Sequence, residues 1–288
     1  MATVFITGTS KGIGLAAAIA FARAGHKVAA AMRSPDQAPE LANIAARETL
    51  PITVYKMDVD VDASVREGVG RITKELGPID VLVNNAGIER MGTVEELALT
   101  EYRAVMETNY FGVIRCTKAV LPSMTQRKSG CIINVASVAG RIASPSMSAY
   151  SASKFALESL SEILAAEVKS LGIRVAIVEP GIIDTEMARH ITIVPSTSNY
   201  SHQTRLAALF TASLKNPVSP SIVADKILEI AVNGTWQLRH PVGPDALPFL
   251  GWRKSMTDEA WIDLGALSDD AWYDRIQADF GMDARPKK

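Results

Sequence analysis

The sequence is poor in the residues that build disulfide frameworks and metal centres. It has two cysteines, Cys116 and Cys131, and four histidines in 288 residues. Neither residue type shows the close spacing that is typical of a metal-binding motif. We therefore expect two buried free thiols in a reducing compartment, and no metal site.

A strong net charge and long apolar runs are also missing. The 30 basic and 31 acidic residues leave a net charge of −1, which gives no indication of a nucleic acid or an anionic membrane as a partner. No apolar run reaches the roughly 18 residues that span a bilayer. The chain begins directly with an expected strand, without the charged lead of a signal peptide. We therefore expect a cytoplasmic protein.

Apolar residues make up 48% of the chain, enough for a large core. Short apolar runs alternate with helical patterns, and this alternation predicts an α/β fold, a Rossmann-type doubly wound parallel sheet in three α/β/α layers. Without a linker or repeat, we expect residues 1–288 to form a single domain. The expected strands are 2–7, 27–32, 52–59, 79–87, 131–136, 173–181 and 235–240. The expected helices are 15–25, 40–48, 62–76, 100–121, 149–171, 219–232, 257–264 and 268–279.

A glycine-rich turn follows the first expected strand. Gly8, Gly12 and Gly14 allow a tight turn and a close approach of the backbone to a pyrophosphate at a helix N-terminus. The spacing is G-x-x-x-G-x-G and does not match G-x-G-x-x-G literally. Its position at the first strand–helix junction predicts a dinucleotide site.

The second expected strand does not end in an acid, which NAD-selective sites use to bind the ribose 2′-hydroxyl. Arg33 stands there, Lys11 lies in the glycine-rich turn, and Asp36 follows Pro35 as a turn residue. Two cations near the ribose suit the 2′-phosphate of NADP. The alternative is two solvated surface charges. We predict NADP as the cofactor.

Tyr150 and Lys154 stand four residues apart, on one face of an expected helix. A nearby ammonium lowers the pKa of a phenol from its usual value of about 10, so the pair predicts an acid/base device. The alternative is a surface Tyr–Lys pair. Ser137 follows the run 131–136, whose carboxyl end places its hydroxyl in the ligand crevice of an open sheet.

Other polar residues at expected strand ends allow two interpretations. Asp58 either accepts from an adenine amino group or caps the next helix. Asn109, inside the helix 100–121, is either an exposed residue or offers its backbone to a buried water near Lys154. For Asn84 we favour a structural role.

These motifs stand in the order and spacing of one family. Over residues 2–185 closely, and beyond them loosely, the chain resembles the short-chain dehydrogenase/reductase family. The resemblance implies a Rossmann-type fold and hydride transfer between a nicotinamide and a carbonyl or alcohol. It is carried by TGTSKGIG at 7–14, NNAG at 84–87, Asn109, Ser137, Tyr150 with Lys154, and PGIIDT at 180–185.

The resemblance also implies a role for each site residue. Tyr150 is the general acid in reduction and the base in oxidation, and Lys154 holds the nicotinamide ribose and lowers the Tyr150 pKa. Ser137 hydrogen-bonds the substrate oxygen, and Asn109 holds a water of the proton relay. A homodimer or homotetramer is implied, built on helices 100–128 and 149–171. The implied cofactor residues are Gly8, Ser10, Lys11, Gly12, Ile13, Gly14, Arg33, Asp58, Val59, Asn85, Ala86, Gly87, Tyr150, Lys154, Pro180, Gly181, Ile183 and Thr185.

Two segments fall outside the matched motifs. Residues 182–215 stand where the family places its substrate lid, and residues 241–288 form a tryptophan-rich C-terminal extension, expected to pack on the body or a second subunit. Pro241, Pro244 and Pro248 are expected to break regular structure. HPVGPDA at 240–246 loosely resembles the steroid- and retinol-dehydrogenase branch. The apolar lid residues expected to line the pocket or pack inward are Met187, Ile191, Ile193, Val194, Tyr200, Leu206, Leu209 and Phe210.

The leading hypothesis is an NADP-dependent reductase of an apolar aldehyde or ketone. The same residues would also catalyse oxidation of a steroid, retinol or other alcohol. A non-catalytic NADP-sensing protein is a further alternative, although the Tyr–Lys pair is intact. The short chain after the sheet argues against nucleotide-sugar epimerase or dehydratase chemistry.

Overall fold

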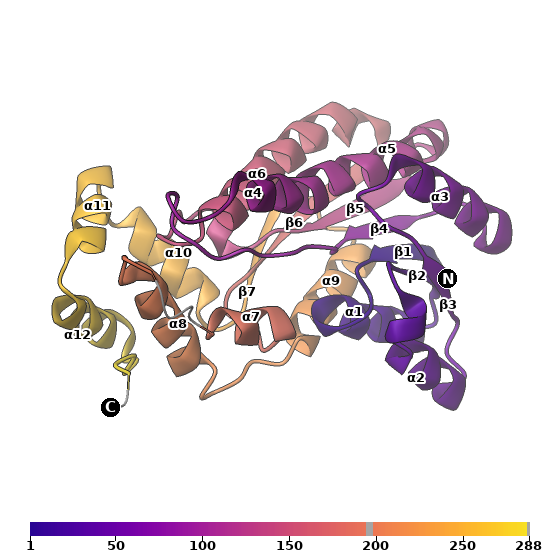
Figure 1. Cartoon of the computed structure of the whole chain (residues 1–288). Coiled ribbons are helices and arrows are strands. Elements are labelled where there is room, and N and C mark those ends of the chain that lie inside the picture. Colours follow the sequence, from indigo (N-terminus) through magenta and orange to yellow (C-terminus); the bar gives the residue numbers. More distant parts are fainter. Residues whose placement is uncertain (194–197, 287–288) are drawn as a thin grey trace.

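A computed structural model describes residues 1–193 and 198–286 of the chain. Within them, seven parallel strands form one sheet in the order β3-β2-β1-β4-β5-β6-β7 (Figure 1). The strand order reverses beside β1, so the carboxyl ends of β1 and β4 border a ligand crevice. The doubly wound parallel sheet is confirmed. The strands are β1 (Thr3–Thr7), β2 (Lys27–Met32), β3 (Ile52–Lys56), β4 (Val81–Asn84), β5 (Gly130–Val135), β6 (Ile173–Pro180) and β7 (Arg239–Val242).

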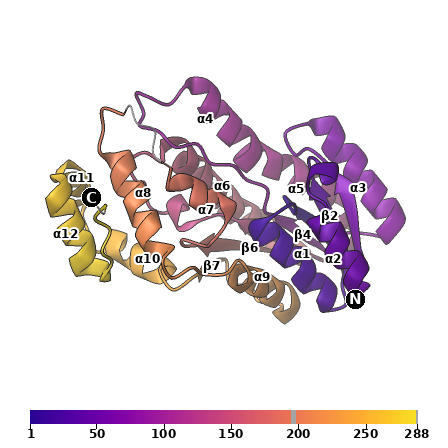
Figure 2. The ribbon, with the colours of Figure 1, turned by 60° about the horizontal axis from the view of Figure 1, so that its bottom comes forward.

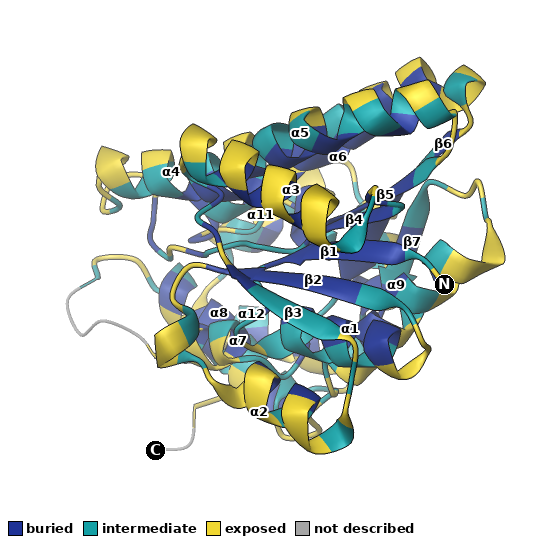
Figure 3. Ribbon diagram, turned by 90° about the vertical axis from the view of Figure 1, so that its right-hand side faces the viewer, coloured by how far each residue is buried: buried dark blue, intermediate teal, exposed yellow. Residues whose placement is uncertain are grey.

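Helices cover both faces of the sheet, and strand side chains alternate between two cores. Val4 points to the core formed with α1, α2 and α9, whereas Phe5 points to the core formed with α3, α5 and α6. Figure 3 shows the buried strands between these layers, with exposed residues on the outer sides of the helices. The helices are α1 (Gly12–Arg23), α2 (Glu40–Glu48), α3 (Asp62–Leu76), α4 (Leu99–Met106), α5 (Gly112–Arg127), α6 (Ser148–Val168) and α9 (Ser221–Asn233). The π-helical turn η2 (Glu107–Phe111) joins α4 to α5, and the short turn η3 (Val138–Gly140) follows β5.

Three prolines lie inside elements that they were expected to interrupt. The helix expected to end before Pro122 continues to Arg127. Pro122 and Lys118, whose carbonyl loses a backbone donor, are both exposed to water. Pro248 is the third residue of helix α10 (Ala246–Lys254), where backbone N–H groups have no helical acceptor. Pro241 lies in β7, which pairs with β6 and forms one edge of the described sheet.

Most of the remaining helices gather at one end of the molecule, with the short helix 186–191 nearer its centre (Figure 2). These are α7 (Glu186–Ile191), α8 (His202–Ser213), α10, α11 (Asp258–Ala266) and α12 (Asp269–Phe280). Buried Arg205 of α8 pairs with Asp269 at 2.6 Å, so the C-terminal helices pack on α8. Trp236 is 51% exposed and lies apart, against Lys169. Edge-to-face contacts join Phe249, Trp252, Trp261 and Phe280.

Candidate active site

A cleft of about 520 Å³ follows the carboxyl ends of the strands. Nearly all residues expected to bind the cofactor or to act in catalysis line it, although they come from six strand ends and two helices. Gly14 and Asn109 are expected site residues that do not line it. The expected residues in the lining are Gly8, Ser10, Lys11, Gly12, Ile13, Arg33, Asp58, Val59, Asn85, Ala86, Gly87, Ser137, Tyr150, Lys154, Pro180, Gly181, Ile183 and Thr185.

The glycine-rich turn after β1 has the geometry of a phosphate cradle. Gly8 and Gly12 have φ angles of 70° and 58°, in the region that favours glycine. A Cβ on Gly12 would lie 3.3 Å from Thr185, which begins α7 on the far side of the cleft. Helix α1 starts here without a side-chain cap, so its first N–H groups are free to bind an anion. These features fit the pyrophosphate of a dinucleotide.

Gly14 and Asn85 hold this turn in place through contacts with its backbone. A Cβ on Gly14 would lie 2.2 Å from the Gly8 carbonyl oxygen, so no larger residue fits. The Asn85 amide donates to the carbonyls of Thr7 and Gly8, each at 3.0 Å. Gly14 therefore shapes the cradle without reaching the cleft.

The end of the cleft beside β2 carries both expected cations. Arg33 is exposed at its rim. Lys11 pairs with Glu186 of α7 at 2.7 Å, and both side chains are mostly exposed. Such a pair contributes less than about 1 kcal/mol, so an incoming phosphate can compete for Lys11. Asp58 accepts from the Asp60 N–H at 3.1 Å, which makes it a turn-forming residue rather than a helix cap.

Ser137, Tyr150 and Lys154 meet at the centre of the cleft. Lys154 is 4% exposed, and its Nζ donates to the Val135 carbonyl at 2.9 Å. The same Nζ lies 5.6 Å from the centroid of the Tyr150 ring. Ser137 begins η3 and accepts from the Ala139 N–H at 3.1 Å. The sheet edge and one helix turn thus hold two hydroxyls and an ammonium together.

Burial dominates the acid/base properties of this group. It raises the pKa of Tyr150 to about 12, an effect that Ser137 opposes and Glu89 reinforces. Burial also lowers the pKa of Lys154 to about 8, while Glu158 raises it. The expected lowering of the Tyr150 pKa by Lys154 is not seen, since burial raises this pKa and Lys154 is not among the groups that shift it. The phenol is protonated at neutral pH.

Asn109 lies in the π-helical turn η2, a feature often found at functional sites. Its amide is fully buried, donating to the Ile88 carbonyl and to Ser153 and accepting from the Ile88 N–H. Ser153 in turn donates to the Tyr150 carbonyl at 2.7 Å. The Asn109 side chain therefore aligns α6 with the loop after β4. A relay water at its backbone stays a prediction.

Among the acidic residues that were not predicted, Glu89 lies in the cleft wall and Asp245 supports a loop beside the cleft. Glu89, 6% exposed in the cleft wall, has one oxygen 2.7 Å from His190 Nδ1 of α7. Asp245 accepts from the Ile182 N–H at 2.8 Å and supports the loop after β6. Each stands two positions after a glycine in a loop, where an acidic residue is usually solvated. The signal in the sequence that could have indicated a role at the site is their position shortly after the end of a strand.

Apolar side chains form part of the substrate side of the cleft, beside Glu89, Arg90 and His190. Met187, Ile191 and Phe210 of the expected lid line it, together with Met147. The other expected wall residues differ. Leu206 and Leu209 pack into neighbouring clusters, Ile193 and Tyr200 are exposed, and Val194 lies outside the described residues.

The described residues carry neither a candidate metal centre nor a candidate membrane span. No three His, Cys, Asp or Glu side chains there gather as metal ligands. No helix in the same residues is long and apolar enough to cross a bilayer. Cys116 and Cys131 are buried free thiols.

Comparisons with known proteins agree with this geometry. The model of the short chain dehydrogenase family matches residues 2–193. Oxidoreductase BOA17 of Botryotinia fuckeliana is 37% identical over 272 residues, covering 92% of this chain and 98% of that protein. Retinol dehydrogenase 8 of Bos taurus is 40% identical over 203 residues, covering 69% of this chain and 64% of that protein. A short-chain dehydrogenase structure from Streptomyces avermitilis superposes with a TM-score of 0.77 at 32% identity, covering 93% and 98% of the two chains. Other solved structures of this fold hold NAD or NADP.

Proposed function

The chain belongs to the short-chain dehydrogenase/reductase family, an oxidoreductase family, and we propose that it reduces an apolar aldehyde or ketone with NADPH. The observation that carries this proposal is a protonated phenol beside a serine hydroxyl in a cleft whose substrate side is partly apolar. Reduction needs a proton donor at the carbonyl oxygen, and Tyr150 is one at neutral pH.

The groups of the chain have separate roles in this reaction. NADPH, when bound, supplies the hydride. The Tyr150 hydroxyl donates its proton to the carbonyl oxygen, and Ser137 Oγ donates a hydrogen bond to the same oxygen, where negative charge develops. The Lys154 ammonium, near the Tyr150 ring, stabilises the phenolate that is left. The glycine-rich turn and the N-terminus of α1 hold the pyrophosphate.

The preference for NADPH rests on charge at the end of β2. No acid stands at the end of that strand, and Arg33 and Lys11 line this end of the cleft. A 2′-phosphate carries close to two negative charges, whereas the 2′-hydroxyl of NADH carries none. Guanidinium–phosphate hydrogen bonds are among the strongest in proteins.

Replacing Arg33 with Ala tests this preference. We expect NADPH to bind roughly 10–100-fold more weakly, because a charged hydrogen bond worth about 1.5–3 kcal/mol is lost. NADH binding should change less than about twofold. Arg23, an exposed cation paired with Glu48 away from the cleft, is a matched control as Arg23→Ala. Equal losses for both cofactors in Arg33→Ala would contradict a 2′-phosphate contact.

A second candidate is oxidation of an apolar alcohol by the same residues, favoured by the likeness to retinol dehydrogenase 8. Oxidation needs the phenolate of Tyr150, whose pKa of about 12 disfavours it at neutral pH. The rate of alcohol oxidation should therefore rise with pH more steeply than that of carbonyl reduction.

We also propose that the chain forms a single domain and acts in the cytoplasm. In this domain, residues 182–215 cover the substrate, and residues 241–288 pack against residues 182–215 and stabilise them. Packing of α12 on α8 supports the bracing role. A homodimer or homotetramer is supported by exposed apolar side chains on the helices of one face, Leu99, Phe111, Phe155 and Ile163.

A further inference from the structure

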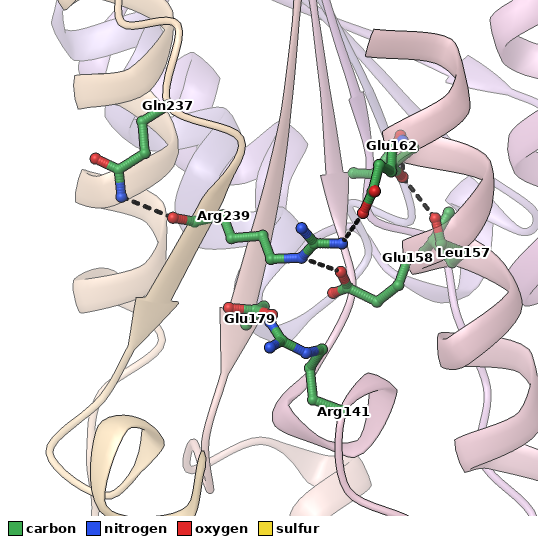
Figure 4. A network of polar contacts seen from close by, with 9 residues as sticks. Arg141, Leu157, Glu158, Glu162, Glu179, Gln237 and Arg239 are labelled. Carbon is green, nitrogen blue, oxygen red and sulfur yellow. Dashed lines mark hydrogen bonds and ion pairs between the residues drawn. The ribbon is translucent and has the colours of Figure 1, made fainter. Parts of the chain in front are cut away.

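A cluster of charged residues surrounds two buried carboxylates, one of them Glu158, which lies one helical turn from Lys154 on α6. Glu158 of α6 and Glu179 of β6 are 4% and 0% exposed. Figure 4 shows the side chain of Arg239 extending from β7 to Glu158 and Glu162 of α6, with Arg141 beside Glu179. Neither carboxylate belongs to the cleft lining.

Each buried carboxylate has one paired and one unpaired oxygen. Arg239 donates to Glu158 Oε2 at 2.9 Å and to Glu162 at 2.6 Å. Arg141 donates to Glu179 at 3.2 Å. Glu158 Oε1 and Glu179 Oε2 are buried without a hydrogen-bond partner among the described residues. A half-satisfied buried carboxylate costs free energy, so packing alone does not account for Glu158.

Glu158 is positioned to act on Lys154. It lies four residues further along α6, on the same side of the helix as Lys154. Gly140 brings η3 against this part of α6, since a Cβ there would lie 3.0 Å from both Glu158 Cγ and the Lys154 carbonyl oxygen. This close packing keeps water away from the pair, and charges interact more strongly where water is excluded.

The surrounding charges set the pKa of the Glu158 carboxyl. Burial and Glu179 raise the pKa of Glu158 to about 7, while Arg239 and Arg141 lower it. Glu158 is the charged neighbour that opposes the effect of burial on the pKa of Lys154. Arg239 therefore limits the rise of the Glu158 pKa, and Glu158, in its ionised form, favours the ammonium form of Lys154.

We propose that Glu158 is a positioning residue for catalysis, a buried anion one helical turn from Lys154 that maintains its ammonium form and is itself held by Arg239 of β7. Because it deepens the proposed function, this inference depends on Lys154 binding the cofactor ribose as an ammonium. The edge strand β7 is thereby connected to the catalytic lysine, although it contributes nothing to the cleft lining.

The test measures NADPH dissociation constants from pH 6 to 10 by nucleotide fluorescence, which needs no substrate or turnover. In the unchanged protein, binding should weaken as the pH rises through the pKa of Lys154, about 8. In Glu158→Gln, this midpoint should move down by roughly one unit, because a nearby anion is lost without a change in shape. Arg239→Gln should move it in the same direction, since Glu158 then protonates more readily.

Glu162→Gln is the matched control, because Glu162 binds the same guanidinium from the same helix but is 63% exposed. In this variant, the midpoint of the pH dependence of NADPH binding should stay where it is in the unchanged protein. The variant Lys154→Met tests the proposed role of Lys154 in cofactor binding separately from the proposed role of Glu158. If Lys154→Met binds NADPH normally at all pH values, the proposed role of Lys154 fails. If Lys154→Met abolishes the pH dependence but Glu158→Gln and Arg239→Gln keep the original midpoint, the role of Glu158 alone is overturned.

Discussion

At the scale of single residues, the site is organised around two hydroxyls and one ammonium. Ser137, Tyr150 and Lys154 were predictable because their spacing and position after a buried strand are local features of the chain. Glu158 and Arg239 were not predictable as partners, because 81 positions separate them and only the fold brings them within 2.9 Å. The direction of the Tyr150 pKa shift depends on the burial of its side chain, and burial cannot be inferred from the spacing of Tyr150 and Lys154 in the sequence.

Ser137→Ala should lower kcat for carbonyl reduction about 10²–10³-fold, because a hydrogen-bond donor to the developing oxyanion is lost. The side chain also caps η3 through Ala139, so stability should fall by about 1 kcal/mol. Steady-state rates and urea unfolding of one preparation measure both effects. Ser137→Thr keeps the hydroxyl and should recover most of the activity. If Ser137→Ala turns over normally, Ser137 does not contact the substrate oxygen.

At the scale of elements, most boundaries follow from apolar periodicity and turn residues, which act over a few positions. Three differences from the expected elements involve proline, since α5 continues past Pro122, β7 contains Pro241 and the unexpected helix α10 contains Pro248. Proline was expected to interrupt each element. The free-energy cost of its missing N–H is small at these three positions, because Pro122 is exposed to water, Pro241 lies on an edge strand and Pro248 lies in a first helical turn. The π-helical turn holding Asn109 also had no local signal, because contacts with Ile88 and Ser153 stabilise it from distant segments.

The contact between η3 and α6 is the element-scale feature that orients Ser137 toward Tyr150 and Lys154. Gly140→Ala should destabilise the protein by about 1–3 kcal/mol and reduce turnover, because the new Cβ would press on the α6 backbone at 3.0 Å. Gly70→Ala in α3 is the control, since nothing lies within 4 Å there. It should stabilise the helix by up to about 1 kcal/mol. Chemical denaturation of both variants measures the difference, and an equally stable Gly140→Ala would argue against tight packing at this contact.

At the scale of the whole molecule, a sheet of buried strands brings six separated turns to one edge, and those turns form the cleft. The sequence predicted this arrangement because a parallel sheet places all carboxyl strand ends together. It did not predict how the C-terminal helices pack. Their attachment to α8 depends on Arg205 and an aromatic cluster assembled from three helices.

The most direct test of the account is the initial rate of NADPH oxidation with a panel of apolar aldehydes and ketones, measured for the unchanged protein and for Tyr150→Phe. We expect turnover with NADPH at neutral pH that falls at least about 100-fold in Tyr150→Phe. NADPH affinity should change little, because the ring is kept. Undiminished turnover in Tyr150→Phe would contradict the assignment of the proton donor, and tight NADPH binding without turnover on any carbonyl would favour a cofactor-sensing protein instead.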